Sequence, residues 1–439
     1  MNKFDIIVFG GGTAGCAAAY IAGKLGLKVL LLEKNSFLGG TMTSGLVIPA
    51  MKSSDNQINT EFYNDLISEM SSLGGQITYQ NNPGWFNPEL LKIALDNLML
   101  KANVEVRFNI SINEIIHKNK LVTGIALCTN ILSGYNYTIY TDNTDNTIQS
   151  DNLLSEYIDT RYAVDATGNA EIFQILNCNF LENKNETQPF SLRFIMGGID
   201  LNKFGKWLLD VDSDRNVTTV EDIGGNIHLS TAYTWDSNKE WALRPLFEDA
   251  IANDILKESD SNYFQVFTIP GMPDSLAFNC PRIVDTDGTV TAKNMSKALS
   301  EGRQAILRLV KFCKTYFPGF DNSYLSNIAD SLGIRTSHRI KGKYVYTMQD
   351  IVSGKKFSTP VAVANYPIDV HSKDKNASTL KKVQDYQIPI EACMSDDYDN
   401  LFAVGRCISC DYMAQGAIRV QPTCFSMGEG VARRIKENI

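Results

Sequence analysis

The chain has 439 residues, enough for two or three domains with a large buried core, and its 21% of charged residues is ordinary for a globular protein. Its 41 lysines and arginines against 49 aspartates and glutamates give a net charge of −8 without a basic stripe, so we expect no nucleic-acid partner. No apolar run is long enough to cross a bilayer, the first core strand leaves no room for a signal peptide, and the nine scattered cysteines are typical of reduced thiols, so we expect a cytoplasmic protein without a membrane partner.

The chain begins with the pattern of a nucleotide-binding strand, turn and helix. Residues 5–9 form a nearly all-apolar run, which predicts a strand buried on both faces of a parallel sheet. Gly10, Gly12 and Gly15 follow with the spacing G-x-G-x-x-G. The first glycine permits a tight turn, the second lets the backbone approach a pyrophosphate, and the third lets the next helix pack closely on the strand.

A helix over 14–25 and a second buried strand over 28–32 complete this unit, and an acidic residue ends it. Glu33 comes close to the spacing of about 20 residues at which an acid hydrogen-bonds an adenosine ribose. The same carboxylate would repel the 2′-phosphate of NADP. The alternative is a βαβ unit that binds no nucleotide, but because all the parts come in the required order we interpret the stretch as a dinucleotide site.

The segment after this unit is rich in glycine and hydroxyl groups at Gly39-Gly40-Thr41, and we expect it to run along a longer cofactor. A buried strand is expected again near Tyr162, ending in a small-residue turn. Between them we expect helices over 59–73 and 88–100 (the second with Asn87 as N-cap and Pro88 as its first residue), a meander of strands over 104–110, 111–117 and 121–128, and a polar surface insertion over 138–159.

The pattern of residues changes near residue 185, and we expect a separate sheet with helices from there on. A helix over 295–317 is stopped by Pro318-Gly319, and a terminal helix over 423–435 follows Pro422 as its first position. The last apolar run, 400–404, has strand character. We therefore predict one domain built from residues 1–185 and 386–439, with residues 186–385 inserted as a substrate or cap domain.

Four blocks of the sequence together resemble the FAD-dependent oxidoreductase family with the glutathione-reductase-type FAD-binding fold. The terminal block resembles the branch that reads Gly-Arg-Cys-Ile-Ser and then Arg-Val-x-Pro-Thr-Cys. The resemblance implies an α/β protein whose Rossmann-type FAD-binding domain, a parallel sheet plus a β-meander, carries an inserted α+β substrate domain. The blocks are GGGTAG…LLEK…LGGT at the start, VDATGNA at 164–170, SLGIRTSHRI at 331–340, and LFAVGRCISCDYMAQGAIRVQPTCFSMGEG at 401–430.

The resemblance also implies FAD as cofactor and a role for particular residues. The chain departs from the family pattern at Asn169, where Asp is frequent, at Tyr412, where His is expected, at His338, where Arg is usual, and at Arg406, where many relatives carry Asp. By position, the pyrophosphate of FAD would contact Gly10, Gly12, Thr13, Ala14 and Gly15, and its adenosine would contact Glu33 and Ile112, with Lys34 as a further cofactor contact. FAD would pass the end of the sheet at Ala166, Thr167 and Gly168, and its ribityl chain and ring would run beside Gly39, Gly40 and Thr41. Gly405 and Arg406 would lie against the ribityl chain or the pyrophosphate, and Arg419, Val420, Pro422 and Thr423 would face the pyrimidine edge.

Candidate catalytic residues lie in two segments of the middle region. Asp369 and His371 alternate along an extended stretch, so both side chains share a face and the carboxylate can orient the imidazole as a base. The alternative is an ordinary surface or core histidine. Arg335 and Arg339 could anchor an anionic or polar substrate, and a structural ion pair is the alternative for each.

The terminal C-x-x-C of Cys407 and Cys410 lacks a second pair at metal-binding spacing, so we expect packed thiols and no metal site. These observations predict an FAD-dependent oxidoreductase that transfers a hydride between a small organic substrate and flavin N5. With one G-x-G-x-x-G, a second nicotinamide domain is not expected, although NADH or another electron acceptor could bind transiently. The alternatives are a flavin-bearing electron-transfer subunit of a larger complex and a non-catalytic nucleotide-binding module.

Overall fold

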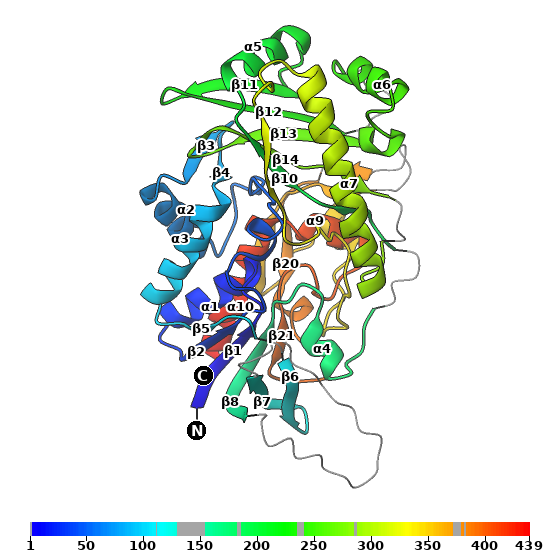
Figure 1. Cartoon of the computed structure of the whole chain (residues 1–439). Coiled ribbons are helices and arrows are strands. Elements are labelled where there is room, and N and C mark those ends of the chain that lie inside the picture. Colours follow the sequence, from blue (N-terminus) through cyan, green and yellow to red (C-terminus); the bar gives the residue numbers. More distant parts are fainter. Residues whose placement is uncertain are drawn as a thin grey trace.

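Two large sheets organise the protein (Figure 1). The computed structural model describes residues 2–110, 112–129, 154–181, 186–234, 241–284, 288–371, 379–381 and 383–439. In the first sheet, β5 (Glu105–Arg107), β2 (Val29–Leu32), β1 (Asn2–Phe9), β8 (Leu154–Asp165) and β21 (Leu401–Ala403) run parallel, and β7 (Leu121–Thr129) and β6 (Ile112–Lys118) continue from β8 as an antiparallel meander.

The first sheet is buried because its central strands are apolar on both faces. Ile6, Ile7, Val8 and Phe9 are fully buried. Helix α1 (Thr13–Lys24) packs against the terminal helix α10 (Gln421–Glu437), and Figure 1 shows the two side by side. Small residues permit this contact, since a Cβ added at Gly428 would lie 2.1 Å from the carbonyl oxygen of Ala14.

The second sheet stands above the first in Figure 1 and is covered by helices α5 (Leu201–Val211), α6 (Arg244–Ala252) and α7 (Ala292–Tyr316). Its core is aromatic, with Phe264 in ring contact with Phe247, Phe278 and Phe317. The strand order is β11 (Thr218–Ile223), β12 (Asn226–Thr234), β13 (Tyr263–Ile269), β14 (Met272–Phe278), β10 (Phe194–Gly197) and β16 (Tyr324–Ile328).

Shorter elements join the two sheets. A hairpin of β3 (Gln76–Tyr79) and β4 (Asn82–Phe86) reaches the second sheet, where Trp85 packs its ring edge on Phe267. The remaining elements are η1 (Gly40–Met42), α2 (Glu61–Ser72), α3 (Pro88–Lys101), α4 (Glu171–Ile175), β9 (Phe190–Ser191), η2 (Glu258–Ser261), β15 (Arg282–Ile283), α8 (Met348–Ser353), β17 (Pro360–Ala364), β18 (Ile368–Val370), β19 (Thr379–Lys381), β20 (Tyr386–Pro389), η3 (Ile390–Ala392) and α9 (Tyr412–Ile418).

The predicted α/β class, with a parallel sheet and a meander, is confirmed, and three local predictions are wrong. The strand expected over 104–110 is not part of the meander, because β5 pairs in parallel with β2 at the edge of the sheet. Residues 154–159 of the expected surface insertion belong to β8, because their backbone pairs with β7; residues 130–153 lie outside the described part. Helix α10 begins at Gln421, so Pro422 is its second residue. The N-cap Asn87 of α3 accepts hydrogen bonds from the N–H groups of Glu89 and Leu90, as expected.

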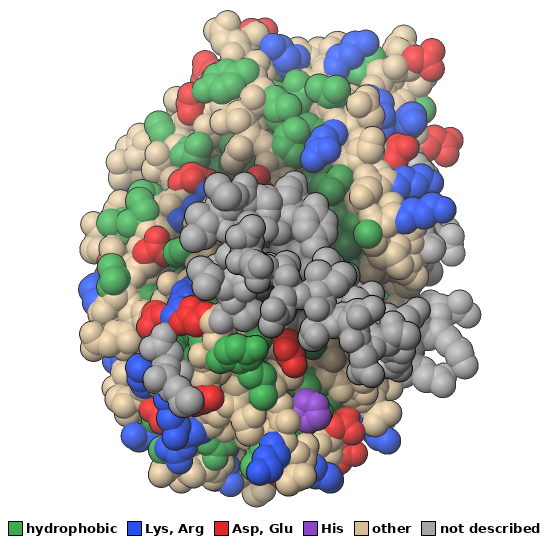
Figure 2. All heavy atoms as spheres, turned by 60° about the horizontal axis from the view of Figure 1, so that its bottom comes forward, with side chains coloured by type: hydrophobic (Ala, Val, Ile, Leu, Met, Phe, Trp, Pro, Cys, Tyr) green, Lys and Arg blue, Asp and Glu red, His purple; other side chains and the backbone are tan. Residues whose placement is uncertain are grey.

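The outer surface mixes both signs of charge. On the face that Figure 2 shows, basic and acidic side chains alternate around small hydrophobic areas wherever the described residues are visible. Within the described ranges, no helix combines the length and apolar character that crossing a bilayer requires.

Candidate active site

Loops at the carboxyl ends of β1, β8 and β21 meet at one edge of the first sheet, and we call the region outside that edge the crevice. Gly10 turns the chain at a φ of +97°, and the N–H of Ala166 donates to the carbonyl of Phe9 at 2.8 Å. A Cβ at Gly15 would lie 1.9 Å from the carbonyl oxygen of Gly10, so the start of α1 touches the turn. Ligands of open parallel sheets bind in this crevice, outside the carboxyl ends of the strands.

Gly12 differs from the other two glycines, because nothing in the protein itself requires glycine there. Its φ of −78° and ψ of −168° suit any residue. An added Cβ would meet only the Cα of Gly40, at 3.8 Å. Gly12 is also the N-cap of α1 and caps it with no side chain. An open backbone position at an uncapped helix N-terminus fits the close approach of a phosphate group.

Glu33 is placed beside this loop at the end of β2 and is 5% exposed. One carboxylate oxygen, Oε2, accepts the N–H of Gly11 at 2.7 Å, and the other, Oε1, accepts the backbone and side-chain N–H groups of Asn35 at 2.9 and 2.7 Å. A carboxylate offers about four acceptor positions, so one remains for a ribose hydroxyl. The N–H of Ile110 donates to the carbonyl of Glu33, which places the start of β6 at Ile112 close by.

Lys34 does not reach into the crevice. Its ammonium pairs with Glu171 at 3.2 Å, and its side chain is 62% exposed. The backbone of the loop from Gly39 onward follows the crevice instead: the N–H of Gly39 donates to the carbonyl of Gly11 at 2.8 Å, and a Cβ at Gly40 would lie 2.7 Å from the Cα of Gly12.

Thr41 lies in the short helix η1, and the chain beyond it leads to residues 331–339. The hydroxyls of Ser44 and Ser331 are 2.9 Å apart, and the N–H of Ser331 donates to the carbonyl of Ser44. The loop that begins beside the pyrophosphate-type turn therefore ends against residues 331–339, which carry Arg335.

Arg406, next to the turn at Gly405, packs over the turn that follows β8. Its Nη2 donates to Oδ1 of Asn169 at 2.9 Å, and its Cζ would lie 3.1 Å from a Cβ at Gly168. Its Nε is buried without a partner, and burial lowers the pKa of the guanidinium. Because Asn169 is neutral, this contact leaves the positive charge of Arg406 uncompensated.

Beneath the same turn, Asp165 ends β8 and is fully buried. It accepts the N–H and the hydroxyl of Thr167 and the N–H of Ile172, which ties the turn to α4. Burial, opposed in part by these hydrogen bonds, raises the pKa of Asp165 to about 6.

Asp369 and His371 lie together, as their alternation predicts. The imidazole Nε2 is 3.0 Å from Oδ2 of Asp369, and Nη2 of Arg282 lies 2.7 Å from Nδ1. An arginine can only donate, so Nδ1 accepts and Nε2–H donates to the carboxylate. Burial first, and then the charge of Arg335, lower the pKa of His371 to about 3, so the ring is neutral near pH 7.

Arg419 lies on the other side of this carboxylate. Its Nη2 donates to the carbonyl oxygen and to Oδ2 of Asp369, at 3.1 and 3.2 Å. It directly precedes α10, whose N-cap, Val420, supplies no side-chain cap. Thr423, in the first turn of α10, is fully buried and its hydroxyl has no partner. The start of α10 thus offers backbone N–H groups and a buried hydroxyl to a ligand.

Two further arginines share this region. Arg335 is 7% exposed and donates to the carbonyl of Pro189 at 3.0 Å. Arg193 is also 7% exposed and has no hydrogen bond or ion pair within the described chain. We call Arg193, Arg282, Arg335 and Arg419 the arginine cluster.

Two expected features fall outside this cluster. Arg339 is buried and pairs with Glu186, at 2.5 Å, and not with the cluster. Cys407 and Cys410 are buried free thiols, and burial raises the pKa of both. The described residues include no group of three or more His, Cys, Asp or Glu that could hold a metal ion.

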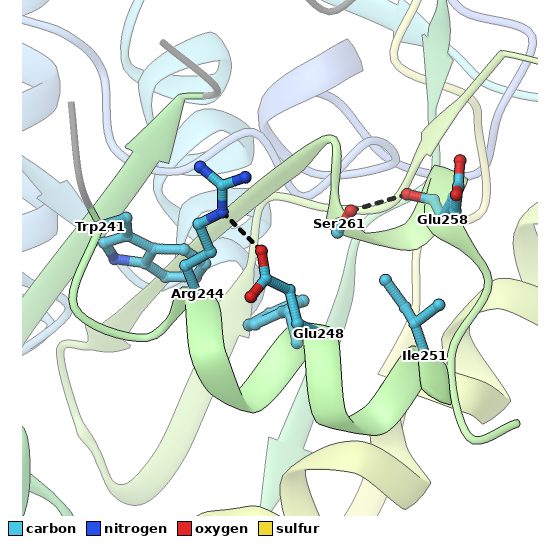
Figure 3. A pocket seen from close by; sticks show the side chains of 7 residues that line it. Trp241, Arg244, Glu248, Ile251, Glu258 and Ser261 are labelled. Carbon is cyan, nitrogen blue, oxygen red and sulfur yellow. Dashed lines mark hydrogen bonds and ion pairs between the residues drawn. The ribbon is translucent and has the colours of Figure 1, made fainter. Parts of the chain in front are cut away.

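A separate pocket of about 260 Å³ lies beside α6, and none of the residues predicted for the site lines it. Figure 3 shows Trp241 and the ion pair between Arg244 and Glu248 at its wall.

Sequence reasoning missed Arg193, Arg282 and Gln188. The side-chain amide of Gln188 accepts the backbone N–H of His371 at 3.0 Å and donates to the hydroxyl of Thr336. Gln188 therefore joins residues 331–339 to the segment that carries Asp369 and His371. The available signal was an arginine inside an otherwise apolar run, as in Phe190-Ser-Leu-Arg-Phe-Ile-Met, because arginine is seldom fully buried without a partner.

The model of the family described as FAD dependent oxidoreductase matches residues 5–435. A ferredoxin–NADP reductase of Malacoplasma penetrans is 21% identical over 294 residues, covering 52% of this chain and 90% of that protein. A digeranylgeranylglycerophospholipid reductase 2 of Methanothermobacter thermautotrophicus is 57% identical over 37 residues, which are 8% of this chain and 10% of that protein.

Two solved structures extend the comparison. A geranylgeranyl bacteriochlorophyll reductase-like protein from Thermoplasma acidophilum has a TM-score of 0.45 at 14% identity, over 100% of this chain and 79% of that one. The flavin-dependent brominase Bmp2 has a TM-score of 0.46 at 13% identity, over 100% and 79%.

Proposed function

Because the chain belongs to the FAD-dependent oxidoreductase family, we propose that it transfers a hydride between a small organic substrate and FAD beside the start of α10. Bound FAD supplies the two-electron chemistry at N5 of its ring, while the protein supplies orientation and electrostatics. The observation that carries this placement is Gly12, a glycine that neither its backbone angles nor its neighbours require. The residue types present fit the cofactor.

The proposed FAD contacts follow the crevice from Glu33 to α10. The uncapped start of α1 faces the pyrophosphate, and the free acceptor position of Glu33 takes a ribose hydroxyl. Arg406 adds an uncompensated positive charge near the phosphates or the ribityl chain. In full, we propose Gly10, Gly12, Thr13, Ala14, Gly15, Glu33, Gly39, Gly40, Thr41, Ile112, Ala166, Thr167, Gly168, Gly405, Arg406, Arg419, Val420, Pro422 and Thr423; Lys34 contributes at most from the rim.

The reactive end of the cofactor lies, in this proposal, between α10 and the Asp369–His371 pair. The free N–H groups at the start of α10 and the charge of Arg419 favour negative charge on the pyrimidine edge of the flavin. His371 takes the substrate proton at Nδ1 and Asp369 holds its other nitrogen. Since Nδ1 accepts from Arg282 in this structure, Arg282 must first turn to another acceptor.

The proposal also covers the branch of the family, the domain division, the cellular location and the electron carrier. We propose the glutathione-reductase-type form of the fold and the branch with the Arg-Val-x-Pro-Thr-Cys block. We also propose the division into residues 1–185 and 386–439 around an inserted 186–385, a cytoplasmic location, and NADH or another electron carrier as a transient partner. Family membership favours an enzyme over a non-catalytic nucleotide-binding module or an electron-transfer subunit.

Anaerobic flavin bleaching tests the proposal directly. The purified protein should be yellow and release FAD on denaturation, and one member of a panel of hydroxy acids, polyols, amines, NADH and NADPH should bleach it. His371→Asn should slow that reduction by about 10² to 10⁴ and keep FAD bound. His117→Asn, at an exposed site of β6, is the matched control and should reduce at the wild-type rate. Recovery of FMN or NAD alone would refute the cofactor assignment, and an unchanged rate in His371→Asn would refute the base.

A further inference from the structure

Arg193 is a buried cation that the protein leaves without an anion. It lies in the two-residue link between β9 and β10 and is 7% exposed. Its Nε is buried without a hydrogen bond, and within the described chain no carboxylate lies within 4 Å of its guanidinium. An uncompensated buried charge is strongly destabilising, so such a residue is retained where a ligand supplies the missing charge.

The other members of the arginine cluster add further positive charge to that of Arg193. Arg335 donates to a backbone carbonyl, and Arg282 stacks over the ring of Tyr263 at 4.2 Å and donates to neutral His371. Within the described ranges, Arg419 is the one member of the cluster that contacts a carboxylate, that of Asp369. The Nε groups of Arg282 and Arg419 are also buried without partners.

Contacts bring the four guanidinium groups into one region, since Arg282 bonds to His371, and His371 and Arg419 both contact Asp369. Burial, and then the charges of Arg282, Arg419 and Arg193, lower the pKa of Arg335 well below its ordinary value. The hydroxyl of Ser191 lies 3.5 Å from Nη1 of Arg335, and Gly333 packs against both Ser191 and Nη1 of Arg193.

Among the residues that the structure describes, four positive charges therefore face one negative charge, because His371 and Tyr263 are neutral near pH 7. The pKa of Asp369 lies below its usual value despite burial, since His371 and the nearby arginines favour the carboxylate. The cluster thus carries a net charge of about +3, and a reduced flavin anion would account for one compensating charge.

We propose that the substrate is a small organic dianion, with two carboxylates or a phosphate monoester, whose charged groups bind the arginine cluster. This proposal rests on the proposed function, because it places the substrate beside the reactive end of FAD. Guanidinium forks match both carboxylate and phosphate oxygens in a bidentate manner. A dianion would also give Arg282 the acceptor that it needs to release Nδ1 of His371.

The test titrates the holoenzyme with four compounds of similar size: malate, glycerol 3-phosphate, lactate and glycerol. Binding is measured by calorimetry and by the change in flavin absorbance. Malate or glycerol 3-phosphate should bind at least about ten-fold more tightly than lactate, and glycerol should not bind; the preferred dianion separates the dicarboxylate from the phosphate ester. Arg193→Met should weaken that binding by about 10- to 100-fold, and Arg193→Lys should recover part of it.

Thermal stability without added anion distinguishes a ligand site from a structural one. Arg193→Met removes an uncompensated charge and breaks no internal hydrogen bond, so its melting temperature should be equal to or above that of the wild type. The matched control is Arg308→Met, which leaves Asp260 buried without its bonds of 2.6 and 2.8 Å. It should melt at a lower temperature and bind the dianion normally.

The outcomes separate this inference from the proposed function. If Arg193→Met melts lower than the wild type and binds dianions unchanged, or if FAD is bleached by a neutral compound while no dianion binds, the inference is wrong and the oxidoreductase assignment stands. If the protein retains no FAD, the proposed function fails, and calorimetry with the dianions still reports on the arginine cluster.

Discussion

Replacing Gly12 and Gly15 one at a time by alanine separates a glycine kept for the cofactor from one kept for the fold. At Gly12 the backbone angles are ordinary and an added Cβ meets only the Cα of Gly40, at 3.8 Å. Alanine should stabilise the folded chain by about 0.4–1 kcal/mol through the unfolded state, and should cost a similar amount as a poorer N-cap than glycine. The free energy of unfolding of the apoprotein should therefore change by less than about 1 kcal/mol.

At Gly15 the same methyl group meets the protein itself. Its Cβ would lie 1.9 Å from the carbonyl oxygen of Gly10 and 2.9 Å from the Cβ of Ala166, whereas ordinary contact begins at 3.4 Å. Helix α1 would have to move by about 1.5 Å from its strand, and overpacking of this kind costs about 1–3 kcal/mol or more. The gain in helix propensity, at most about 1 kcal/mol, does not offset it.

Urea unfolding of both apoproteins and fluorescence titration with FAD measure the two effects. Gly12→Ala should unfold like the wild type and bind FAD at least about ten-fold more weakly, because its methyl group occupies the approach to the pyrophosphate. Gly15→Ala should unfold at lower urea. If Gly12→Ala binds FAD with wild-type affinity, the pyrophosphate does not pass Gly12 and the placement of the cofactor is wrong.

Three further predictions concern charge. Arg419→Ala, with FAD bound, should weaken the flavin–sulfite adduct and lower the two-electron potential by some tens of millivolts, the equivalent of one charged contact of about 1.5–3 kcal/mol; unchanged values in both assays would exclude contact with the flavin. The pKa of His371 is about 3 in the folded protein and 6.5 in the unfolded chain, so the unfolded chain binds this proton first as the pH falls, and stability that is present above pH 6.5 should be lost toward pH 3. In a series of urea unfolding experiments at different pH, His371→Gln should flatten the dependence of the free energy of unfolding on pH in this range. An identical slope in the variant would contradict the buried neutral ring. Asp165→Asn should lower the free energy of unfolding by about 1–3 kcal/mol, because an amide N–H₂ cannot accept from the N–H of Ile172 as the carboxylate does; denaturant unfolding checks this, and wild-type stability would show that the contact is dispensable.

Patterns over short stretches of the sequence were enough to predict the first strand–turn–helix–strand unit and the α/β class of the fold. The glycine spacing, the apolar strand and Glu33 lie within about 30 residues of each other, so turn geometry and helix packing constrain them directly. The proximity of Asp369 and His371 was predictable for the same reason, since alternation along an extended stretch acts over two residues. Their roles, like those of the proposed FAD contacts, remain predictions.

Local sequence patterns did not indicate where pairing between distant segments would extend a strand or bring a hydrogen-bond partner to a side chain. The sequence pattern predicts a polar loop through residue 159, yet residues 154–159 form the start of β8 because β7 offers backbone hydrogen bonds to them. Arg282 occupies Nδ1 of His371 from 89 positions away, which no spacing rule could indicate.

The sequence by itself determined the nucleotide-binding turn, the α/β class and the family, because each depends on short-range geometry or on matched blocks. Only the tertiary structure decided the charge balance of the arginine cluster. Arg193, Arg282, Arg335 and Arg419 come from four separate segments, and their net positive charge exists only where folding removes water and brings them to one carboxylate. Because these side chains are buried, their excess positive charge destabilises the folded protein, and this effect can be recognised only once the distances between the groups and their exposure are known.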